Sequence, residues 1–206
     1  MKYSHRFNLI ALFVLSVSFT SVVAQEKCKS VIFFAGKVQG SSLLKDYKKH
    51  LNQDISFGSS PTGMGFLVEK TMKFKSEFAM LKTANAEYYL YLYLGSYTGR
   101  FNITIDTPMK IGLEDNSEII IYPIKDGDRI TGGPNKLSVF YTLTKQQIEK
   151  FSLSHLDNVK IYFSAEKELK GSAEDELGSY FNFDFEKGHK WFMKTAKCML
   201  QSELVN

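Results

Sequence analysis

The histidines, cysteines and serines of this 206-residue chain do not match the spacing of the common catalytic motifs. Beyond the first residues, its histidines are His50, His155 and His189. No two of them are four residues apart, and no His-Glu-x-x-His segment occurs, which excludes the zinc-binding helix of metallohydrolases. The two cysteines cannot form the paired clusters of a structural zinc site. The Gly-x-Ser-x-Gly segment of serine hydrolases is also missing.

Carboxylates offer two further kinds of chemistry. Two turns supply loop oxygens that suit calcium, namely Asp126 with Asp128 and Glu114 with Asp115. The EF-hand pattern is not met, and aspartate is an ordinary turn residue, so we expect no metal and no cofactor. A pair of acids for glycoside hydrolysis is defined by its separation in space. A carboxylate-dependent hydrolase therefore stays an alternative, with these acids available: Glu174, Asp175, Glu176 and Asp184.

The segment EYYLYLYLGSYTG, residues 87–99, contains a candidate ligand site. In a strand, Tyr89, Tyr91 and Tyr93 lie on one face and the leucines between them on the other. Rows of exposed aromatic rings can stack on sugars. However, tyrosines two residues apart are only about 6.6 Å from each other, so their rings cover one another. Tyrosine is also common in strands that bind nothing. We favour a structural role for the row, then a protein-binding surface, then a sugar platform.

If residues 88–94 and 100–106 form a hairpin, the length of the loop between them sets the pairing register of the two strands. This register decides which face of the strands is buried. A five-residue loop places the tyrosines beside Phe101, Ile103 and Ile105. A four-residue loop places the leucines there and leaves the tyrosines beside Asn102, Thr104 and Asp106. We favour the four-residue loop, because it gathers the apolar side chains and leaves the tyrosine hydroxyls on the polar face.

Residues 1–24 have the layout of a secretory signal peptide. Lys2 and Arg6 precede an apolar run, and a small-residue pattern ends at Ala24. The run is interrupted by serines and is shorter than the ~20 residues of a membrane span. No cysteine stands at the cleavage point, so we expect no lipid anchor. We predict export to the periplasm or the extracellular space, with no membrane span in the mature chain.

Cleavage leaves residues 25–206, whose length suits a single exported α+β domain. The leader carries two positive charges and no negative ones, so the formal net charge falls from +4 to +2. This small charge gives no case for a nucleic-acid partner.

Cys28 and Cys198 lie near the two ends of the mature chain. An even number of cysteines in an exported chain predicts one disulfide. It closes a loop of about 170 residues, which the chain-entropy model values at about 5 kcal/mol at most. Two unpaired buried thiols are the alternative.

The remaining pattern predicts an α+β fold with a mostly antiparallel sheet of about seven to nine strands. Residues 57–65 are expected to form a loop, because glycine, serine and proline dominate them. Apolar and aromatic segments of strand length recur between polar turns, at residues 30–38, 66–81, 88–94, 100–106, 109–113, 118–124, 137–143, 158–164 and 180–185.

Three helices accompany this sheet. Residues 43–51 place apolar side chains on one side and predict a short N-terminal helix. Thr144 and Gln147 match a capping box, which predicts a short helix near residues 145–151 with Ile148 and Phe151 inward. A broad apolar stripe begins at residue 189 and predicts a C-terminal helix packed on the sheet, with its lysines outward.

This order of elements resembles the layout of small, uncharacterised exported proteins of the Bacteroidota. The likeness lies in YYLYLYL, the hairpin MKIGLEDNSEIIIYP, the strand and capped helix FYTLTKQQIEKF, the strand VKIYFS, and a C-terminal helix with a cysteine. The resemblance implies an exported α+β domain and assigns no catalytic residue.

We therefore predict an exported domain that is not an enzyme. It binds an unknown protein or glycan partner at the cell envelope or outside the cell. The alternatives are a carbohydrate or small-ligand binder, or a carboxylate-dependent hydrolase, that uses an aromatic cleft near Tyr89, Tyr91 and Tyr93.

Overall fold

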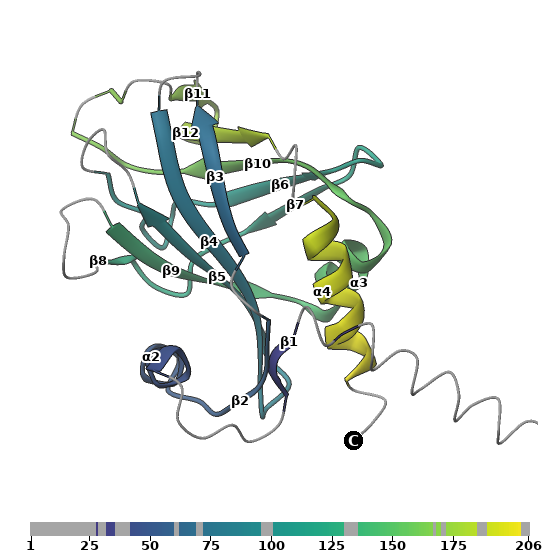
Figure 1. The fold of residues 1–206 in the computed structure, drawn as a ribbon. Helices are drawn as coiled ribbons and strands as arrows, with labels where there is room; N and C mark the ends of the chain where they lie inside the picture. Colours follow the sequence, from purple (N-terminus) through teal and green to yellow (C-terminus); the bar gives the residue numbers. More distant parts are fainter. Residues whose placement is uncertain are drawn as a thin grey trace, which may run out of the picture.

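A computed structural model shows the arrangement of the chain (Figure 1). It describes residues 28, 32–35, 42–59, 62–68, 72–95, 101–129, 136–166, 168–169, 172–184 and 189–202. The predicted signal peptide and the turn after Gly95 lie outside these described residues. The described parts form three helices and twelve strands, and every strand pair is antiparallel. The predicted α+β class is confirmed, with more strands than expected and with the strands divided between two sheets.

The larger sheet has seven strands. Its neighbouring strands are β1 (Ile32–Ala35), β2 (Ile55–Ser59), β4 (Met72–Thr83), β5 (Tyr88–Gly95), β9 (Lys136–Leu143) and β8 (Asp128–Arg129), in that order, and β3 (Thr62–Val68) also pairs with β4. The tyrosine strand β5 is central, since it pairs over its full length with β4 on one edge and with β9 on the other.

The second sheet has five strands. Their order is β11 (Ala173–Asp175), β12 (Gly178–Asp184), β10 (Leu156–Tyr162), β6 (Met109–Leu113) and β7 (Glu118–Ile121). An isolated bridge between Pro123 and Tyr141 joins the chain after β7 to β9 of the larger sheet. β12 and β3 are also in contact, so the two sheets approach each other on both sides.

Two expectations about local structure are wrong. The expected loop at residues 57–65 contains the end of β2 and the beginning of β3. The strand expected at residues 100–106 does not form, and no hairpin joins this segment to β5, because β4 and β9 occupy both edges of β5. The segment contributes one isolated bridge, from Asn102 to Ser164. It then turns, since Thr107 N–H donates to the Thr104 carbonyl at 3.0 Å and the Thr107 hydroxyl accepts from Thr104 N–H at 2.7 Å.

The main core lies between the two sheets. Leu90, Leu92 and Leu94 of β5 are fully buried there, so the leucine face is the dry face. The inner face of the five-stranded sheet supplies the opposite wall through these side chains: Met109, Ile111, Val159, Ile161, Phe181 and Phe183. Phe101 and Ile103 join this core although they form no strand with β5, whereas Ile105 is exposed.

All three predicted helices are confirmed, as α2 (Ser42–Leu51), α3 (Lys145–Leu153) and α4 (His189–Gln201). The capping box is present, since the Thr144 hydroxyl accepts from Gln147 N–H at 3.2 Å and the Gln147 side chain accepts from Thr144 N–H at 2.8 Å. α3 and α4 pack together and help to close the main core (Figure 1). Phe192 of α4 lies 5.6 Å from Phe78 and 5.8 Å from Phe151, measured between ring centroids.

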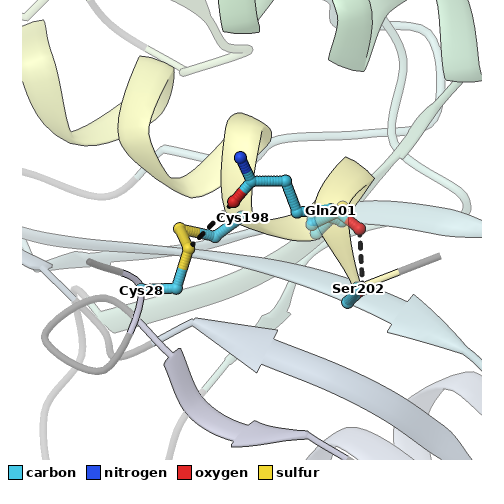
Figure 2. Close-up of a disulfide and its surroundings, with 5 residues drawn as sticks. Cys28, Cys198, Gln201 and Ser202 are labelled. Atoms are coloured by element: carbon cyan, nitrogen blue, oxygen red, sulfur yellow. Dashed lines mark hydrogen bonds between the residues drawn. A yellow bond between two sulfur atoms is a disulfide. The ribbon is translucent and has the colours of Figure 1, made fainter. Parts of the chain in front are cut away.

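A disulfide joins Cys28 to Cys198 in α4 (Figure 2), which confirms the predicted pair. Their Cα atoms are 5.6 Å apart, and both residues are buried. The side-chain amide of Gln201 lies 3.5 Å from the Cys28 sulfur. The bond therefore ties the start of the described chain to its last helix. Among the described helices, none combines the length and the apolar character needed to cross a membrane.

Candidate functional site

Three of the four tyrosines of β5, namely Tyr89, Tyr91 and Tyr93, share the face opposite the main core, and α2 packs on this face. A small second core forms there, from Tyr47, Leu51, Ile55, Ala79, Leu81, Tyr89 and Phe140. The ring of Tyr47 lies 5.0 Å from that of Tyr91, and Phe140 lies 5.1 Å from Tyr91 on the neighbouring strand. Tyr89 is only 8% exposed, while Tyr91 and Tyr93 are half-buried. The structure brings the predicted residues together but uses two of them for packing under α2.

The hydroxyl of Tyr89 belongs to a local polar contact. It donates to the Glu87 carboxylate at 2.7 Å, and the side chain of Gln53 donates to the same oxygen. Burial, followed by the hydrogen bond to Glu87, raises the pKa of Tyr89 to about 12. Hydrogen bonds from Gln53 and Tyr89 lower the pKa of Glu87. Tyr89 therefore stays neutral and donates its hydrogen bond. Through Glu87 it links the start of β5 to Gln53, which follows α2.

Tyr93 lies in a polar row beside the small second core. It stands opposite Glu77 of β4 and Ser138 of β9, and Ser138 stands opposite Asp128 of β8. The Asp128 carboxylate accepts from His50 Nδ1 of α2 at 2.9 Å and from Lys125 Nζ at 2.9 Å. Asp128 is thus engaged in holding α2 against the edge of the sheet. Glu77 and Asp128 are three strands apart, or roughly 14 Å, which is too far for the paired acids of a glycosidase.

The acidic turns considered for calcium use their oxygens within the fold. Asp126 Oδ1 accepts from Ile105 N–H at 2.8 Å. Asp115 Oδ1 accepts from the N–H and the hydroxyl of Ser117 at 3.0 and 2.6 Å. Glu114 lies 3.2 Å from His155. Within the described parts of the chain, no three histidine, cysteine or acidic residues gather as metal ligands would.

The outer face of the five-stranded sheet carries a second set of aromatic and charged residues. Ile120, Lys110, Lys160 and Asn182 stand directly opposite one another across four strands. Two residues further along β10, Tyr162 stands opposite Tyr180, and the register of β6 and β7 brings Tyr122 to the same level. Ile120 is 42% exposed and Tyr122 is 50% exposed. We call this set the outer face.

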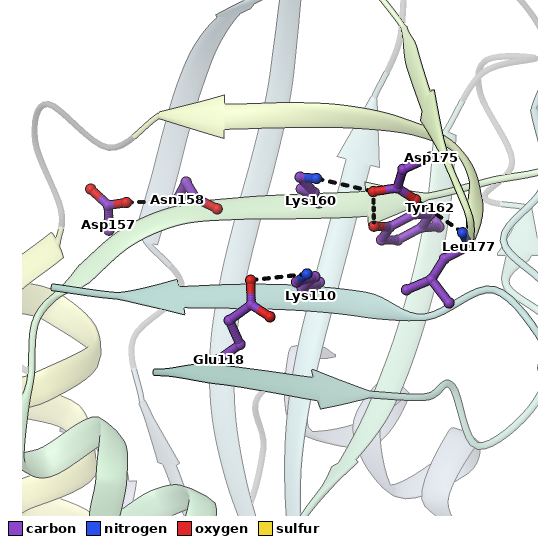
Figure 3. A network of polar contacts seen from close by, with 8 residues as sticks. All are labelled: Lys110, Glu118, Asp157, Asn158, Lys160, Tyr162, Asp175 and Leu177. Carbon is purple, nitrogen blue, oxygen red and sulfur yellow. Dashed lines mark hydrogen bonds and ion pairs between the residues drawn. The ribbon is translucent and has the colours of Figure 1, made fainter. Parts of the chain in front are cut away.

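Two ion pairs order the outer face (Figure 3). Lys110 Nζ lies 2.9 Å from Glu118, on the neighbouring strand. Asp175 accepts from Lys160 Nζ at 3.0 Å and from the Tyr162 hydroxyl at 2.8 Å, both at Oδ2. The tight turn after Asp175 aims this carboxylate at β10: Leu177 N–H donates to its other oxygen at 3.0 Å, and Gly178 takes a φ of +115° that favours glycine.

An aromatic contact completes this network. Lys160 Nζ lies 4.2 Å above the ring of Tyr180, and the rings of Tyr162 and Tyr180 are 5.3 Å apart. The ammonium of Lys160 is therefore held between a carboxylate and an aromatic face.

The pKa shifts in this network keep Lys160 protonated, Tyr162 neutral and Asp175 ionised at neutral pH. Burial, then the hydrogen bond to Asp175, raises the pKa of Tyr162 above its usual value. Burial alone would lower the pKa of Lys160, but the bonds to Asp175 and Tyr180 outweigh it and raise that pKa. Burial alone would raise the pKa of Asp175, but the bonds from Tyr162 and Lys160 outweigh it and lower that pKa. A lysine nucleophile or a tyrosine base needs the opposite shift.

Sequence reasoning did not find the outer face. Tyr122, Tyr162 and Tyr180 belong to three distant segments, and only the pairing of β6, β7, β10 and β12 aligns them. By contrast, the tyrosines of β5 are adjacent in sequence and easily noticed. The alternation of Lys160 with the buried Val159 and Ile161, and of Lys110 with the buried Met109 and Ile111, was a local signal of an outward face. Tyr162 lies on the same side as Lys160 but is only 1% exposed.

Comparison of the chain with protein-family models, curated proteins and solved structures gave no match. The resemblance to exported proteins of the Bacteroidota therefore stays a prediction.

Proposed function

We propose that this protein is an exported binding domain without catalytic activity, which recognises a protein partner at the cell envelope or outside the cell. The outer face is the proposed binding surface. The observation that carries this proposal is the pair of exposed apolar side chains, Ile120 and Tyr122, beside charged residues that are already paired within the sheet.

Such a surface has the composition of a protein interface. Aromatic residues are enriched at the centres of interfaces, while unpaired charges are costly to bury there. Lys110 and Lys160 each keep a carboxylate partner on the same face, so covering them with another protein leaves no lone charge. Tyr122 and Ile120 supply apolar area for the centre of the contact.

Two further observations support the proposal. The pKa directions of Lys160, Tyr162 and Asp175 favour a structural network over a reactive one. The disulfide between Cys28 and Cys198 suits an oxidising compartment, as export requires.

The alternative of a ligand site at the tyrosines of β5 is less well supported. Tyr89 is buried, and Tyr91 is covered by Tyr47 and Phe140, which leaves Tyr93 as the most available ring of the three. A single half-buried ring offers little area for a sugar or another small ligand.

Binding of the mature protein to envelope proteins and to a glycan panel tests both surfaces. The outer-face variant Ile120→Ser/Tyr122→Ala is compared with Tyr93→Ala, and the fold of each is checked by circular dichroism. We expect the outer-face variant to weaken protein binding by at least about 30-fold, as loss of a central contact does, and Tyr93→Ala to bind normally. Glycan binding that only Tyr93→Ala abolishes would instead support the tyrosine site. Turnover of a glycan by the mature protein would contradict a non-enzymatic role.

A further inference from the structure

The solvent side of α4 carries a stripe of three lysines, Lys190, Lys194 and Lys197. All three are exposed, and their spacing of four and three residues places them on one side of the helix. The buried side chains of α4, including Phe192 and Met199, lie on the opposite side. No acidic residue occurs between His189 and Gln201. The stripe is therefore a continuous line of positive charge.

This charge is not compensated within the part of the chain that the structure describes. Four other lysines have carboxylate partners there: Lys48 with Asp54, Lys110 with Glu118, Lys125 with Asp128, and Lys160 with Asp175. None of the three lysines of α4 forms an ion pair with a described residue. α3, which packs beside α4, does not neutralise them, since its exposed charges are Lys145, Glu149 and Lys150.

Two large apolar side chains belong to the turns of α3 and α4 that meet where the stripe begins. Phe151 and Phe192 are 5.8 Å apart between ring centroids, which places the last turn of α3 beside the first turn of α4. That last turn ends with Leu153, whose 82% exposure is extreme for a large apolar residue. The first turn of α4 carries Trp191, which is half-buried beside Phe192. Lysine with exposed leucine and with tryptophan is the combination found at the surface of a bilayer.

The stripe is presented on a rigid support. The disulfide to Cys28 anchors the last turns of α4 (Figure 2). Phe192 packs on Phe78 and Phe151 at the start of this helix. A surface that is ordered before binding loses less entropy when it docks.

We infer that α4, with the end of α3, docks this protein on an anionic lipid surface. The lysines attract the headgroups, and Leu153 and Trp191 enter the boundary between headgroups and acyl chains. An exposed leucine favours a lipid surface over a nucleic acid, whose phosphates need only positive charge. This second surface is separate from the outer face. The proposed export determines only which membrane it meets.

Vesicle binding tests the inference with the disulfide-bonded mature protein. Its partition coefficient is measured on phosphatidylcholine vesicles with and without phosphatidylglycerol. We expect binding only to the anionic vesicles, and a loss of affinity as salt is added. Each lysine near an anionic surface contributes about fivefold, so the variant Lys190→Gln/Lys194→Gln/Lys197→Gln should bind on the order of 100-fold more weakly.

A matched variant separates this surface from net charge. The variant Lys48→Gln/Lys49→Gln/Lys125→Gln removes the same number of positive charges from the region around α2. We expect its affinity for anionic vesicles to fall by less than about tenfold. Equal losses in the two triple variants, or equal binding to neutral and anionic vesicles, would overturn the inference. Leu153→Ser should weaken vesicle binding by roughly tenfold at unchanged salt dependence.

Two further outcomes are decisive. Binding of a short DNA duplex as tight as that of vesicles, with no effect of Leu153→Ser, would make α4 a general polyanion site and overturn the inference. The outer-face variant Ile120→Ser/Tyr122→Ala should bind vesicles as the wild type does. This result separates the inference from the proposed function, since each can fail while the other stands.

Discussion

The ring of Tyr47 in α2 lies 5.0 Å from the ring of Tyr91 in β5, at an interplanar angle of 58°. This contact places a helix over the centre of the tyrosine face. Tyr47 is fully buried, whereas Tyr93, one step further along β5, remains half-buried outside the small second core. The tyrosine face is therefore an internal surface around Tyr91 and a partly open one at Tyr93.

Replacement of Tyr47 tests how much this cover stabilises the fold. Tyr47→Ala should lower the free energy of unfolding by about 3–4 kcal/mol, because it removes a buried aromatic ring and leaves a cavity. Tyr93→Ala should cost only about 1 kcal/mol, because its ring is half-buried. Urea unfolding followed by circular dichroism measures both values. Equal losses would mean that α2 does not depend on Tyr47 for its packing.

The disulfide should contribute strongly to stability. Replacing both Cys28 and Cys198 by serine should lower the free energy of unfolding by about 2–5 kcal/mol, since the bond closes a separation of 170 residues. The same urea experiment measures this loss. A thiol assay on the denatured, unreduced mature protein should find no free thiol. Two free thiols would show that the bond does not form.

Asp175 should make stability depend on pH in the acid range. Its folded pKa is lowered, so its stabilising effect is complete above its unfolded pKa of about 4 and is lost as the pH falls through the folded pKa. Asp175→Asn should cost about 1 kcal/mol at pH 7. The difference from the wild type should shrink between about pH 4 and pH 2.

Chemical unfolding at a series of pH values follows this difference. Asp106→Asn, at an exposed turn, is the control and should track the wild type across the range. A constant difference between Asp175→Asn and the wild type would show that the carboxylate charge has no part in the network.

The capping box should be measurable through its two reciprocal bonds. Thr144→Ala should lower the free energy of unfolding by about 1 kcal/mol, because Gln147 N–H loses its acceptor. Gln147→Ala removes the second bond, to Thr144 N–H. The double variant should cost less than the two single losses added together, since each residue supports the other. Strict additivity in a double-mutant cycle would argue against a coupled box.

The local features of this protein were predictable because each depends on residues close together in the chain. The capping box needs Thr144 and Gln147 only, and its helix follows as expected. The alternation in β5 separates a leucine face from a tyrosine face whatever strands lie beside it, and the leucines are indeed buried. The disulfide followed from an even cysteine count in a chain with a predicted leader.

Strand pairing was not predictable in the same way. Residues 100–106 follow β5 closely and have a strand-like pattern, yet β5 pairs with β9, where Leu92 stands opposite Val139. Many segments of a β-rich chain have compatible alternation, so the pattern of one strand does not select its neighbour. The selection depends on which pairing buries both sheets against one core.

The fold class, the three helices, the disulfide and the two faces of the tyrosine strand can therefore be read from the chain alone. The cover of α2 over Tyr91, and the meeting of Tyr122, Tyr162 and Tyr180 on the outer face, appear only once the chain is folded. The difference lies in the range of the interactions involved. Backbone alternation and capping act within a few residues, whereas a surface is made of side chains that only packing of distant segments brings together.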